Sequence, residues 1–306
     1  MLARSVLLQL ANSKKVESFV RGNNWSSRVA RRFVAGETIE EAVKPVAALN
    51  HQGISVSLDL LGESVRNEGQ VAATVDTYLR VFQAIRENNL NANVSLKLTA
   101  LGLDIDEDLC FRNMSRLLTA AGTKQFIRID MESSEYAQRT LDLFTRLWEG
   151  PGNYRNVGVV IQSYLRRSAA DIERLIGMGA RVRLCKGAYK EAADVAFPDK
   201  ADVDGNYVRL MQRLLSDGCY PGIATHDEKM IAATREFAGA NQIPPERYEF
   251  QMLYGIRRDL QTQLVRDGYR MRVYTPFGTH WYPYLMRRLA ERPANLLFVL
   301  KNMVRG

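Results

Sequence analysis

Residues 157–186, VGVVIQSYLRRSAADIERLIGMGARVRLCK, contain the unit from which the chain is built. A β-rich run at 157–163 is followed by Ile172 and Leu175, which recur at the spacing of one helical face. A glycine then marks the end of the helix, and a second β-rich run begins at Arg181. Strands that alternate with helices in this way pair in parallel through helical crossovers. The unit therefore predicts an α/β fold with a parallel sheet.

The same unit recurs along most of the chain, with amphipathic helical stretches between the β-rich runs. Eight units of about 30 residues fit a closed (β/α)8 barrel better than an open sheet. An open dinucleotide-binding sheet would also show a G-x-G-x-x-G turn after its first strand, where this chain has Gly62-Glu63-Ser64. We predict a distorted TIM-like barrel at 49–306, preceded by a helical segment at 1–48. The β-rich runs are 54–61, 93–99, 125–131, 157–163, 181–186, 222–226, 248–254 and 271–274.

The last helical stretch, at 281–293, carries polar residues where packing residues are usual. Tyr284, Arg287, Arg288 and Glu291 fall at i, i+3, i+4 and i+7 and share one face of the helix. That spacing normally forms the buried apolar stripe of an amphipathic helix. The pattern predicts a helix laid over a site, with two cations directed at an anion. The alternative is a solvated helix with an ion pair.

Composition excludes several classes of protein and leaves others open. The chain is 46% hydrophobic and 25% charged, as in ordinary globular proteins. Its net charge of +8 comes from 42 Lys and Arg against 34 Asp and Glu, interspersed along the sequence. The sequence contains no basic run with interleaved aromatics of the kind that would predict a nucleic-acid surface. The basic excess fits an anionic ligand and an anionic membrane surface equally well.

The cysteines and the apolar stretches bear on the compartment. Cys110, Cys185 and Cys219 lie far apart and form no C-x-x-C pair, which favours a reducing compartment. No stretch approaches the roughly 20 apolar residues of a membrane span. The first ten residues lack the small-residue cleavage site of a secretory signal. A soluble cytoplasmic protein is expected.

Polar residues gather where the predicted strands end, which is where β/α barrels build their active sites. Each alone has a structural alternative, such as a helix cap for Asp130 or a satisfied core group for His226. Polar residues at seven of the eight predicted strands, all toward one end of the barrel, favour a site. Three histidines without partners at ligand spacing give no support to a metal centre, and no nucleophile elbow is present. The residues are Lys97, Asp130, Gln162, Arg183, Lys186, Thr225, His226, Gln251 and Tyr274.

Five cations in these positions predict a cationic cup with few carboxylates facing it. Such a cup would bind an anionic substrate and an anionic cofactor together, and arginine suits carboxylates because its planar fork binds both oxygens. The five are Lys97, Arg183, Lys186, Arg287 and Arg288.

Several segments, in their order along the chain, resemble the proline dehydrogenase family of flavoenzymes. The resemblance extends from about Leu58 to Asn295, and the length is similar to that of the short monofunctional bacterial type. The segments are Leu58-Asp59-Leu60-Leu61-Gly62-Glu63, Ser95-Leu96-Lys97-Leu98, Arg183-Leu184-Cys185-Lys186-Gly187-Ala188-Tyr189, Ala224-Thr225-His226 and Tyr284-Leu285-Met286-Arg287-Arg288-Leu289-Ala290-Glu291.

The resemblance implies a fold and a reaction. The fold is a distorted (β/α)8 barrel whose last helix covers the strand ends. The reaction is FAD-dependent oxidation of L-proline to Δ1-pyrroline-5-carboxylate by hydride transfer to the flavin, the first step of proline catabolism. It implies a quinone as electron acceptor, and it leaves room for a peripheral contact with the inner face of the membrane.

The resemblance also implies a role for each matching residue. Lys97, Arg287 and Arg288 would pair with the substrate carboxylate, and the Tyr274 ring would pack against the substrate ring. Arg183 would stabilise charge on the reduced flavin, with Asp130 supporting the site through hydrogen bonds. The residues implied for the FAD site are Met131, Gln162, Lys186, Gly187, Ala188, Thr225, His226 and Glu291.

Three further points stay open in the sequence. Glu63 could pair with Arg287 as a gate, or the two could form an ordinary exposed ion pair. A Schiff-base aldolase using Lys97 or Lys186 is an alternative function, as is a barrel that only binds an anionic metabolite. The sequence does not fix the oligomeric state, the role of residues 1–48, or the tolerance of hydroxyproline.

Overall fold

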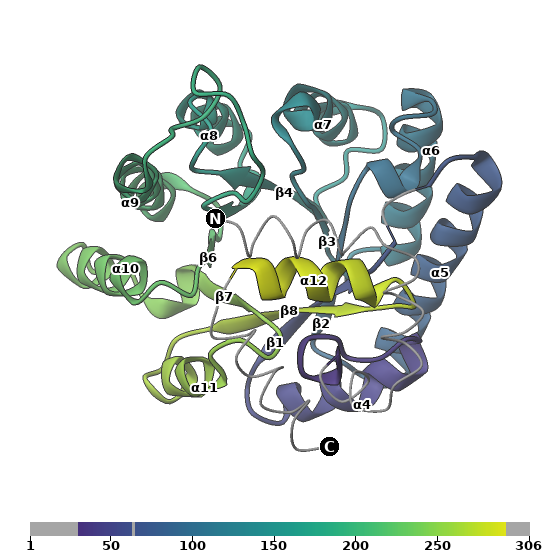
Figure 1. Ribbon diagram of the computed structural model, residues 1–306, viewed down its shortest axis with the longest axis horizontal. Coiled ribbons are helices and arrows are strands. Elements are labelled where there is room, and N and C mark those ends of the chain that lie inside the picture. The colour runs from purple at the N-terminus through teal and green to yellow at the C-terminus, as the bar shows by residue number, and fades with distance from the viewer. Residues whose placement is uncertain (1–29, 63–64, 292–306) are drawn as a thin grey trace.

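Eight parallel strands close on themselves into a barrel in the computed structural model, which describes residues 30–62 and 65–291 (Figure 1). Each strand pairs with the next, and β1 also pairs with β8, so the sheet has no free edge. Each of the eight predicted runs overlaps one strand, which confirms the barrel. The strands are β1 (Ser55–Leu60), β2 (Ala92–Leu96), β3 (Ile127–Ile129), β4 (Val157–Gln162), β5 (Arg181–Cys185), β6 (Gly222–Ala224), β7 (Glu249–Leu253) and β8 (Met271–Phe277).

Helices surround the barrel, and in Figure 1 they form a ring around the sheet. Their starts show the expected signals, for example Asp106 before α6, whose carboxylate accepts a hydrogen bond from the Leu109 amide. The elements outside the sheet are α4 (Ile39–Asn50), α5 (Glu68–Glu87), η1 (Thr99–Leu101), α6 (Glu107–Ala121), α7 (Ser134–Glu149), α8 (Ser168–Gly177), α9 (Lys200–Asp217), α10 (Glu228–Ala240), η2 (Pro245–Arg247), α11 (Arg258–Arg266) and α12 (Trp281–Glu291).

Alternation along each strand separates an apolar layer from a polar interior. On β1, Val56 and Leu58 are fully buried in the main apolar cluster between sheet and helices. Ser57 and Asp59 are also buried, but their side chains contact polar groups from other strands. Successive strand residues point to opposite faces, so this pattern aims the polar set into the barrel. Most β/α barrels fill that space with branched apolar side chains. Here it is filled by hydrogen-bonded and charged groups.

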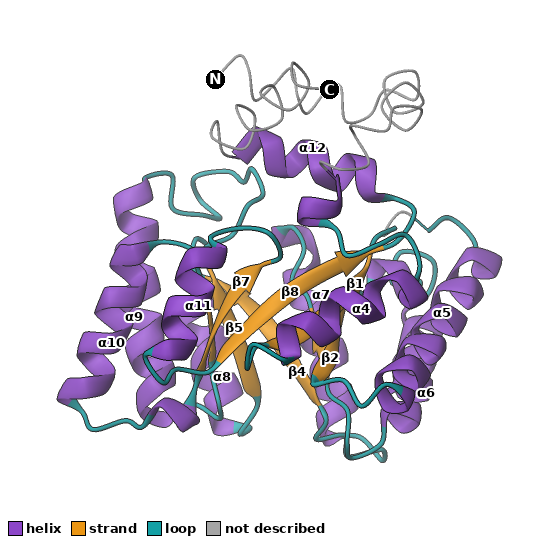
Figure 2. Ribbon diagram, turned by 90° about the horizontal axis from the view of Figure 1, so that it is seen from below, coloured by secondary structure: helices purple, strands orange, loops and turns teal. Residues whose placement is uncertain are grey.

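The last helix, α12, does not pack beside the barrel. Figure 2 shows it lying above the carboxyl ends of the strands, as the sequence led us to expect. It rests on a second apolar cluster, separate from the main one, to which its first two turns contribute most of the large side chains. The Trp281 indole N–H also donates a 2.7 Å hydrogen bond to Glu37. The cluster comprises Ala30, Phe33, Val34, Leu61, Ile256, Trp281, Tyr282, Tyr284, Leu285 and Met286.

Residues 30–37 hold the covering helix from below. The Ala35 amide bonds to the Pro276 carbonyl at 2.9 Å, and the Gly278 amide bonds to the Gly36 carbonyl at 2.9 Å. This stretch therefore extends along the end of β8. The boundary predicted at residue 48 falls inside α4, whose buried Ile39, Ala42 and Val46 belong to the main cluster of the barrel. The part of the N-terminal segment that the structure describes is thus continuous with the barrel.

In the described part of the chain, every helix is too short or too polar to cross a bilayer.

Replacing Gly255 by alanine should weaken the packing that supports α12. Gly255 has a φ of +76°, and a Cβ atom there would lie 1.8 Å from the Arg32 carbonyl oxygen. Strain from the left-handed backbone and the clash should lower the free energy of unfolding by about 2 kcal/mol or more, as measured by urea denaturation. Gly205→Ala is the matched control, because helix α9 leaves open space at that position. The control should change stability by no more than about 1 kcal/mol, in the stabilising direction. Equal values for the two variants would contradict the contact.

Candidate active site at the carboxyl ends of the strands

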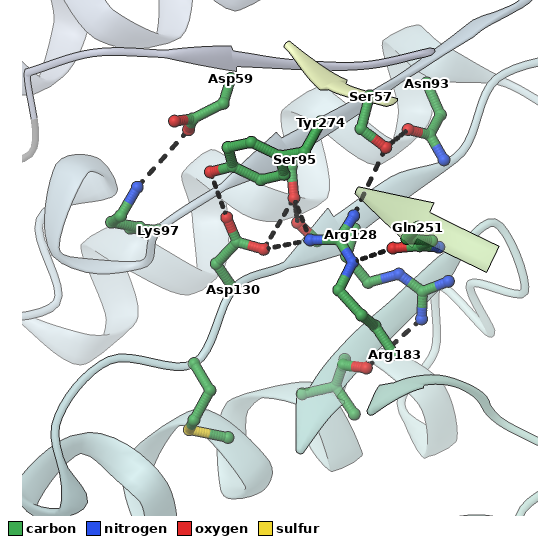
Figure 3. Close-up of polar contacts among 12 residues, drawn as sticks. Ser57, Asp59, Asn93, Ser95, Lys97, Arg128, Asp130, Arg183, Gln251 and Tyr274 are labelled. Carbon is green, nitrogen blue, oxygen red and sulfur yellow. Dashed lines mark hydrogen bonds and ion pairs between the residues drawn. The ribbon is translucent and has the colours of Figure 1, made fainter. Parts of the chain in front are cut away.

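A buried ion pair between Arg183 and Asp130 lies at the centre of the polar interior (Figure 3). Arg183 is on β5, Asp130 directly follows β3, and their closest N–O distance is 2.8 Å. Ser95 of β2 donates to the same carboxylate oxygen at 2.7 Å and accepts from Arg183 at 3.1 Å. Asp130 is therefore not a cap for α7, which begins after Ser133. It fixes a guanidinium.

The other edges of the Arg183 guanidinium are also held. Its Nε donates to the side-chain oxygen of Gln251 on β7, and its Nη2 donates to Ser57 on β1 at 3.4 Å. Ser57 donates in turn to Asn93. The side chain of Arg183 is only 6% exposed, so each of these contacts forms in a poorly hydrated interior. Arg183 is consequently held in one orientation by residues of three other strands, β1, β2 and β7, and by the residue after β3.

Tyr274 of β8 completes this assembly. Its hydroxyl donates to the second oxygen of Asp130 at 2.8 Å, and its ring centre lies 5.3 Å from the Arg183 guanidinium carbon. Burial, reinforced by the Asp130 carboxylate, raises the pKa of Tyr274 well above its usual value, so the phenol stays protonated and donates. One carboxylate thus positions a cation and an aromatic ring together.

Lys97, immediately after β2, lies at the rim of the same interior. Its ammonium group is 3.5 Å from the carboxylate of Asp59, whose side chain is only 2% exposed, while that of Lys97 is 16% exposed. The pair leaves the lysine at the barrel mouth, on the same side as Asp130 and Tyr274 in Figure 3. A half-buried cation in this place can attract an anionic group that enters from the mouth.

Lys186 follows β5 but belongs to a different charge network. It contacts Asp204 of α9 at 2.5 Å and Asp227, the N-cap of α10, at 2.7 Å. The hydrogen bond from Lys186 lowers the pKa of Asp227 despite partial burial. Burial pushes the pKa of Asp204 upward, but hydrogen bonds from Lys186 and Lys200 outweigh it, so that pKa is also lowered. Both carboxylates are therefore charged at neutral pH.

These contacts correct one expectation from the sequence. The cup was expected to have few carboxylates facing its cations, but Lys97, Arg183 and Lys186 each have at least one ion-pair partner. The physical reason is burial, because a charge taken out of water needs a compensating charge close by. The mouth is less cationic than the count of basic residues indicates.

A second group of expected residues lies at the ends of β4, β6 and β7. Gln162 is 3% exposed and donates to the Met131 carbonyl at 3.3 Å, while its side-chain oxygen has no hydrogen-bond partner among the described residues. His226 accepts a 2.9 Å hydrogen bond at Nε2 from the Leu253 amide, which places the ring proton of neutral His226 on Nδ1. Thr225 is buried and accepts from the Asp227 amide. The three are set in defined orientations by the backbone.

The loop after β5 is fastened above these residues. Gly187 has a φ of +102°, and a Cβ atom there would lie 2.2 Å from the Tyr164 ring. Tyr164 donates to Glu191 at 3.2 Å, and Glu191 accepts from both the amide and the hydroxyl of Ser134 at the start of α7. Glycine at 187 is thus required by its backbone and by an aromatic neighbour. Ala188 is exposed.

The covering helix contributes one described cation to this region. The Arg288 guanidinium carbon lies 5.2 Å from the Tyr284 ring centre, and Tyr284 is buried. The backbone of Arg287 and Glu291 lies on α12. Their side chains, and the whole of Glu63, lie outside the described residues, so the expected clamp and gate stay predictions.

Comparison with known proteins identifies the family. The sequence model described as proline dehydrogenase matches residues 42–301. Proline dehydrogenase 1 of Bacillus subtilis is 42% identical over 99% of this chain and 100% of its own length. Proline dehydrogenase of Deinococcus radiodurans is 43% identical over 100% of this chain and 99% of its own length. The chain belongs to the proline dehydrogenase family.

Solved structures agree with this result. Proline utilization A of Bdellovibrio bacteriovorus superposes with a TM-score of 0.82 at 28% identity, covering 87% of this chain and 33% of that protein. The chain thus spans about a third of that larger protein and nearly the full length of the Bacillus and Deinococcus relatives. The barrel and the enzyme class expected from the sequence, a proline dehydrogenase oxidoreductase, are confirmed.

Some residues of the site in this proline dehydrogenase family member were missed by sequence analysis. Ser57, Asn93 and Ser95 are short polar residues inside β-rich runs, and none of them alone indicates a site. The usable signal was alternation: Ser57 and Asp59, like Asn93, Ser95 and Lys97, recur at every second position. Gln251 was noted at a strand end, but its contact with Arg183 crosses 68 positions and has no local signature.

Replacing Asp130 by asparagine should destabilise the protein by about 3 kcal/mol, because it leaves the buried Arg183 charge without a carboxylate. Urea denaturation of the purified variants is the measurement. Glu173→Gln is the control, since it removes an acid from the exposed pair with Arg213 and should have a much smaller effect. If the two substitutions cost the same, the central role of Asp130 is wrong.

Proposed function

We propose that this protein oxidises L-proline to Δ1-pyrroline-5-carboxylate with FAD as its cofactor, as the first step of proline catabolism. Family membership supports the substrate and the reaction. The observation that supports the chemistry is the fixed group of Arg183, Asp130 and Tyr274 under the covering helix. It provides a cation and an aromatic wall in a site screened from water.

Substrate binding is assigned to the rim of the barrel and to α12. Lys97, Arg287 and Arg288 would pair with the carboxylate of proline, and the Tyr274 ring would lie against the pyrrolidine ring. Lys97 is suited to this because it lies at the rim of the polar interior, with 16% of its side chain exposed. In a poorly hydrated site, each contact between an arginine and a carboxylate is stronger than at the surface. The group would fix the ring in one orientation.

The residues present fit FAD. Gln162 presents a buried side-chain oxygen that has no hydrogen-bond partner among the described residues, and an N–H of a bound group would satisfy it. We assign the FAD site to Met131, Gln162, Lys186, Gly187, Ala188, Thr225, His226 and Glu291. The chemistry that FAD supplies when bound is acceptance of a hydride equivalent from the substrate, and a quinone then takes the electrons.

The protein itself contributes position and electrostatics. Arg183 would stabilise negative charge that develops beside it, and the network that holds its guanidinium removes the cost of reorienting it during the reaction. Tyr274 keeps its proton because its pKa is raised, so it serves as a wall and a donor to Asp130 rather than as a base. α12 would exclude water and complete the site.

Two finer parts of the proposal concern closure and location. Glu63 would pair with Arg287 when substrate binds, which would close the mouth. The reaction would take place in the cytoplasm, with contact at the inner face of the membrane where the quinone is found. The net charge of +8 is compatible with an anionic membrane surface.

The Schiff-base alternative is disfavoured by the geometry. An aldolase lysine must give up a proton before it attacks a carbonyl group. In this structure Lys186 forms ion pairs with Asp204 and Asp227, and Lys97 forms one with Asp59, so both amino groups are engaged by carboxylates. The family assignment points the same way.

The proposal is tested by the visible spectrum of the purified protein. A flavin absorption band should be present, and anaerobic addition of L-proline should bleach it. L-Alanine, an amino acid without the pyrrolidine ring, is the control and should leave the band unchanged. A colourless protein that takes up no FAD would show that the cofactor assignment is wrong, and a band that proline does not bleach would exclude the substrate.

Replacing Arg288 by alanine should raise the KM for proline by at least about tenfold, equivalent to about 1.4 kcal/mol, because one partner of the substrate carboxylate is lost. Steady-state dye reduction at varied proline concentration measures it. Arg174→Ala on the outer helix α8 removes an equal charge far from the mouth and should leave KM unchanged. Unaltered KM in both variants would exclude Arg288 from the clamp.

A further inference from the structure

The amino ends of the strands, opposite the proposed active site, surround a second cavity. Its volume is about 510 Å³, and a smaller cavity of about 160 Å³ adjoins it. Both are lined by residues at or just before strand starts, and the side chains they share include Arg181, Tyr220 and Arg272. A space of this size is within the range of small-molecule sites.

The lining has more cations than carboxylates. Glu249 is engaged at 2.6 Å with Arg272, and that cation outweighs burial and lowers the pKa of Glu249. This pair is therefore neutral overall. The remaining charged residues that line the two cavities are the cations Lys124, Arg128, Arg181 and Arg270 near a single carboxylate, Glu246. The cavity is thus positively charged.

Two of these arginines lie close to the same aromatic ring. The Arg181 guanidinium carbon lies 5.3 Å from the centre of the Tyr220 ring, and that of Arg270 lies 5.6 Å from it. Arg270 also donates to the Tyr220 hydroxyl at 3.4 Å. Neither arginine has an ion-pair partner within the described part of the chain. Their guanidinium groups therefore have N–H donors for a planar or tetrahedral anion.

The backbone supports this arrangement. Tyr220 has a φ of +48°, in the left-handed region that bulky residues rarely adopt. Its hydroxyl donates to Glu249 at 3.1 Å, which fixes the ring that both arginines approach. Strained residues held in place by several contacts are concentrated at binding sites.

A separate observation comes from Arg128, which lines the smaller cavity. Arg128 is 3% exposed, and its Nε is buried with no hydrogen-bond partner among the described residues. Burial, together with Arg183 and other nearby arginines, lowers the pKa of Arg128 well below its usual value. A buried donor without an acceptor, in an excess of positive charge, is stabilised by an anion.

We propose that the amino-terminal mouth of the barrel binds a small, doubly charged oxyanion of the phosphate class, held by Arg181 and Arg270 at its entrance. Arginine binds phosphate oxygens in pairs, and the larger cavity has room for a phosphate monoester as well as for free phosphate. The proposal does not depend on the reaction at the other end of the barrel. Asn93, which contacts Ser57 of that site, also lines the smaller cavity, but Arg181 and Arg270 take no part in that site.

The test is binding of inorganic phosphate to the full-length protein with its cofactor. Isothermal titration with sodium phosphate, in a buffer matched in ionic strength with sodium chloride, should give saturable binding. The double variant R181Q/R270Q should weaken that binding at least about tenfold. R80Q/R112Q is the control, because it removes two exposed arginines from α5 and α6 and causes the same change in net charge. It should bind phosphate like the unmodified protein.

Two further measurements keep the outcome clear. Lys124→Gln is a milder variant at the smaller cavity and should weaken phosphate binding a few-fold even if R181Q/R270Q fails to fold. Co-sedimentation with vesicles of phosphatidic acid, a phosphate monoester, against phosphatidylcholine, distinguishes a lipid phosphate from a free one. Binding to the vesicles that is lost in R181Q/R270Q, without binding of free phosphate, assigns the site to a lipid headgroup. The proposal is overturned if neither source binds, or if the cavity variants bind as well as the control.

Discussion

The ion pair between Arg183 and Asp130 is the interaction on which the interior of this barrel depends. A guanidinium buried in the middle of eight strands is tolerated only when its charge and its donors are matched. Asp130 supplies the charge, while Ser57, Ser95 and Gln251 accept hydrogen bonds from three further N–H groups. The same carboxylate orients Tyr274. The polar centre therefore connects most of the sheet. The main apolar cluster lies instead in the layer between the sheet and the helices.

Periodicity made most of the fold predictable. β-rich runs alternate with amphipathic helical stretches along the chain, and eight such units fit a closed barrel better than an open sheet. The end of β8 was placed too early, at Tyr274, whereas the strand continues through Pro276 to Phe277. Proline and the glycine after it are turn signals, but Pro276 lies where β8 pairs with β1, and closure of the barrel overrides them.

The site was less predictable, because partners in space are remote in sequence. That polar residues gather at strand ends follows from the geometry of parallel sheets. The pairing of charges does not follow from that geometry, because Lys186 contacts Asp204, 18 positions away, and Asp227, 41 positions away. The alternation of side chains along a strand would have predicted part of this. Arg183 and Lys186 are three positions apart, so an extended chain directs their side chains to opposite sides. Applied to the sequence, this alternation would have excluded Lys186 from the predicted cationic cup.

The seat of the covering helix joins the two extremes of the described chain. Trp281 bonds to Glu37 across 244 positions, and Phe33 and Val34 pack in the same apolar cluster as α12. During synthesis residues 30–37 leave the ribosome first, and α12 can pack against them only after nearly all of the described chain has been made. Because α12 begins shortly after β8 ends, closure of the sheet and packing of the helix that covers its mouth both depend on the same late stretch of the chain.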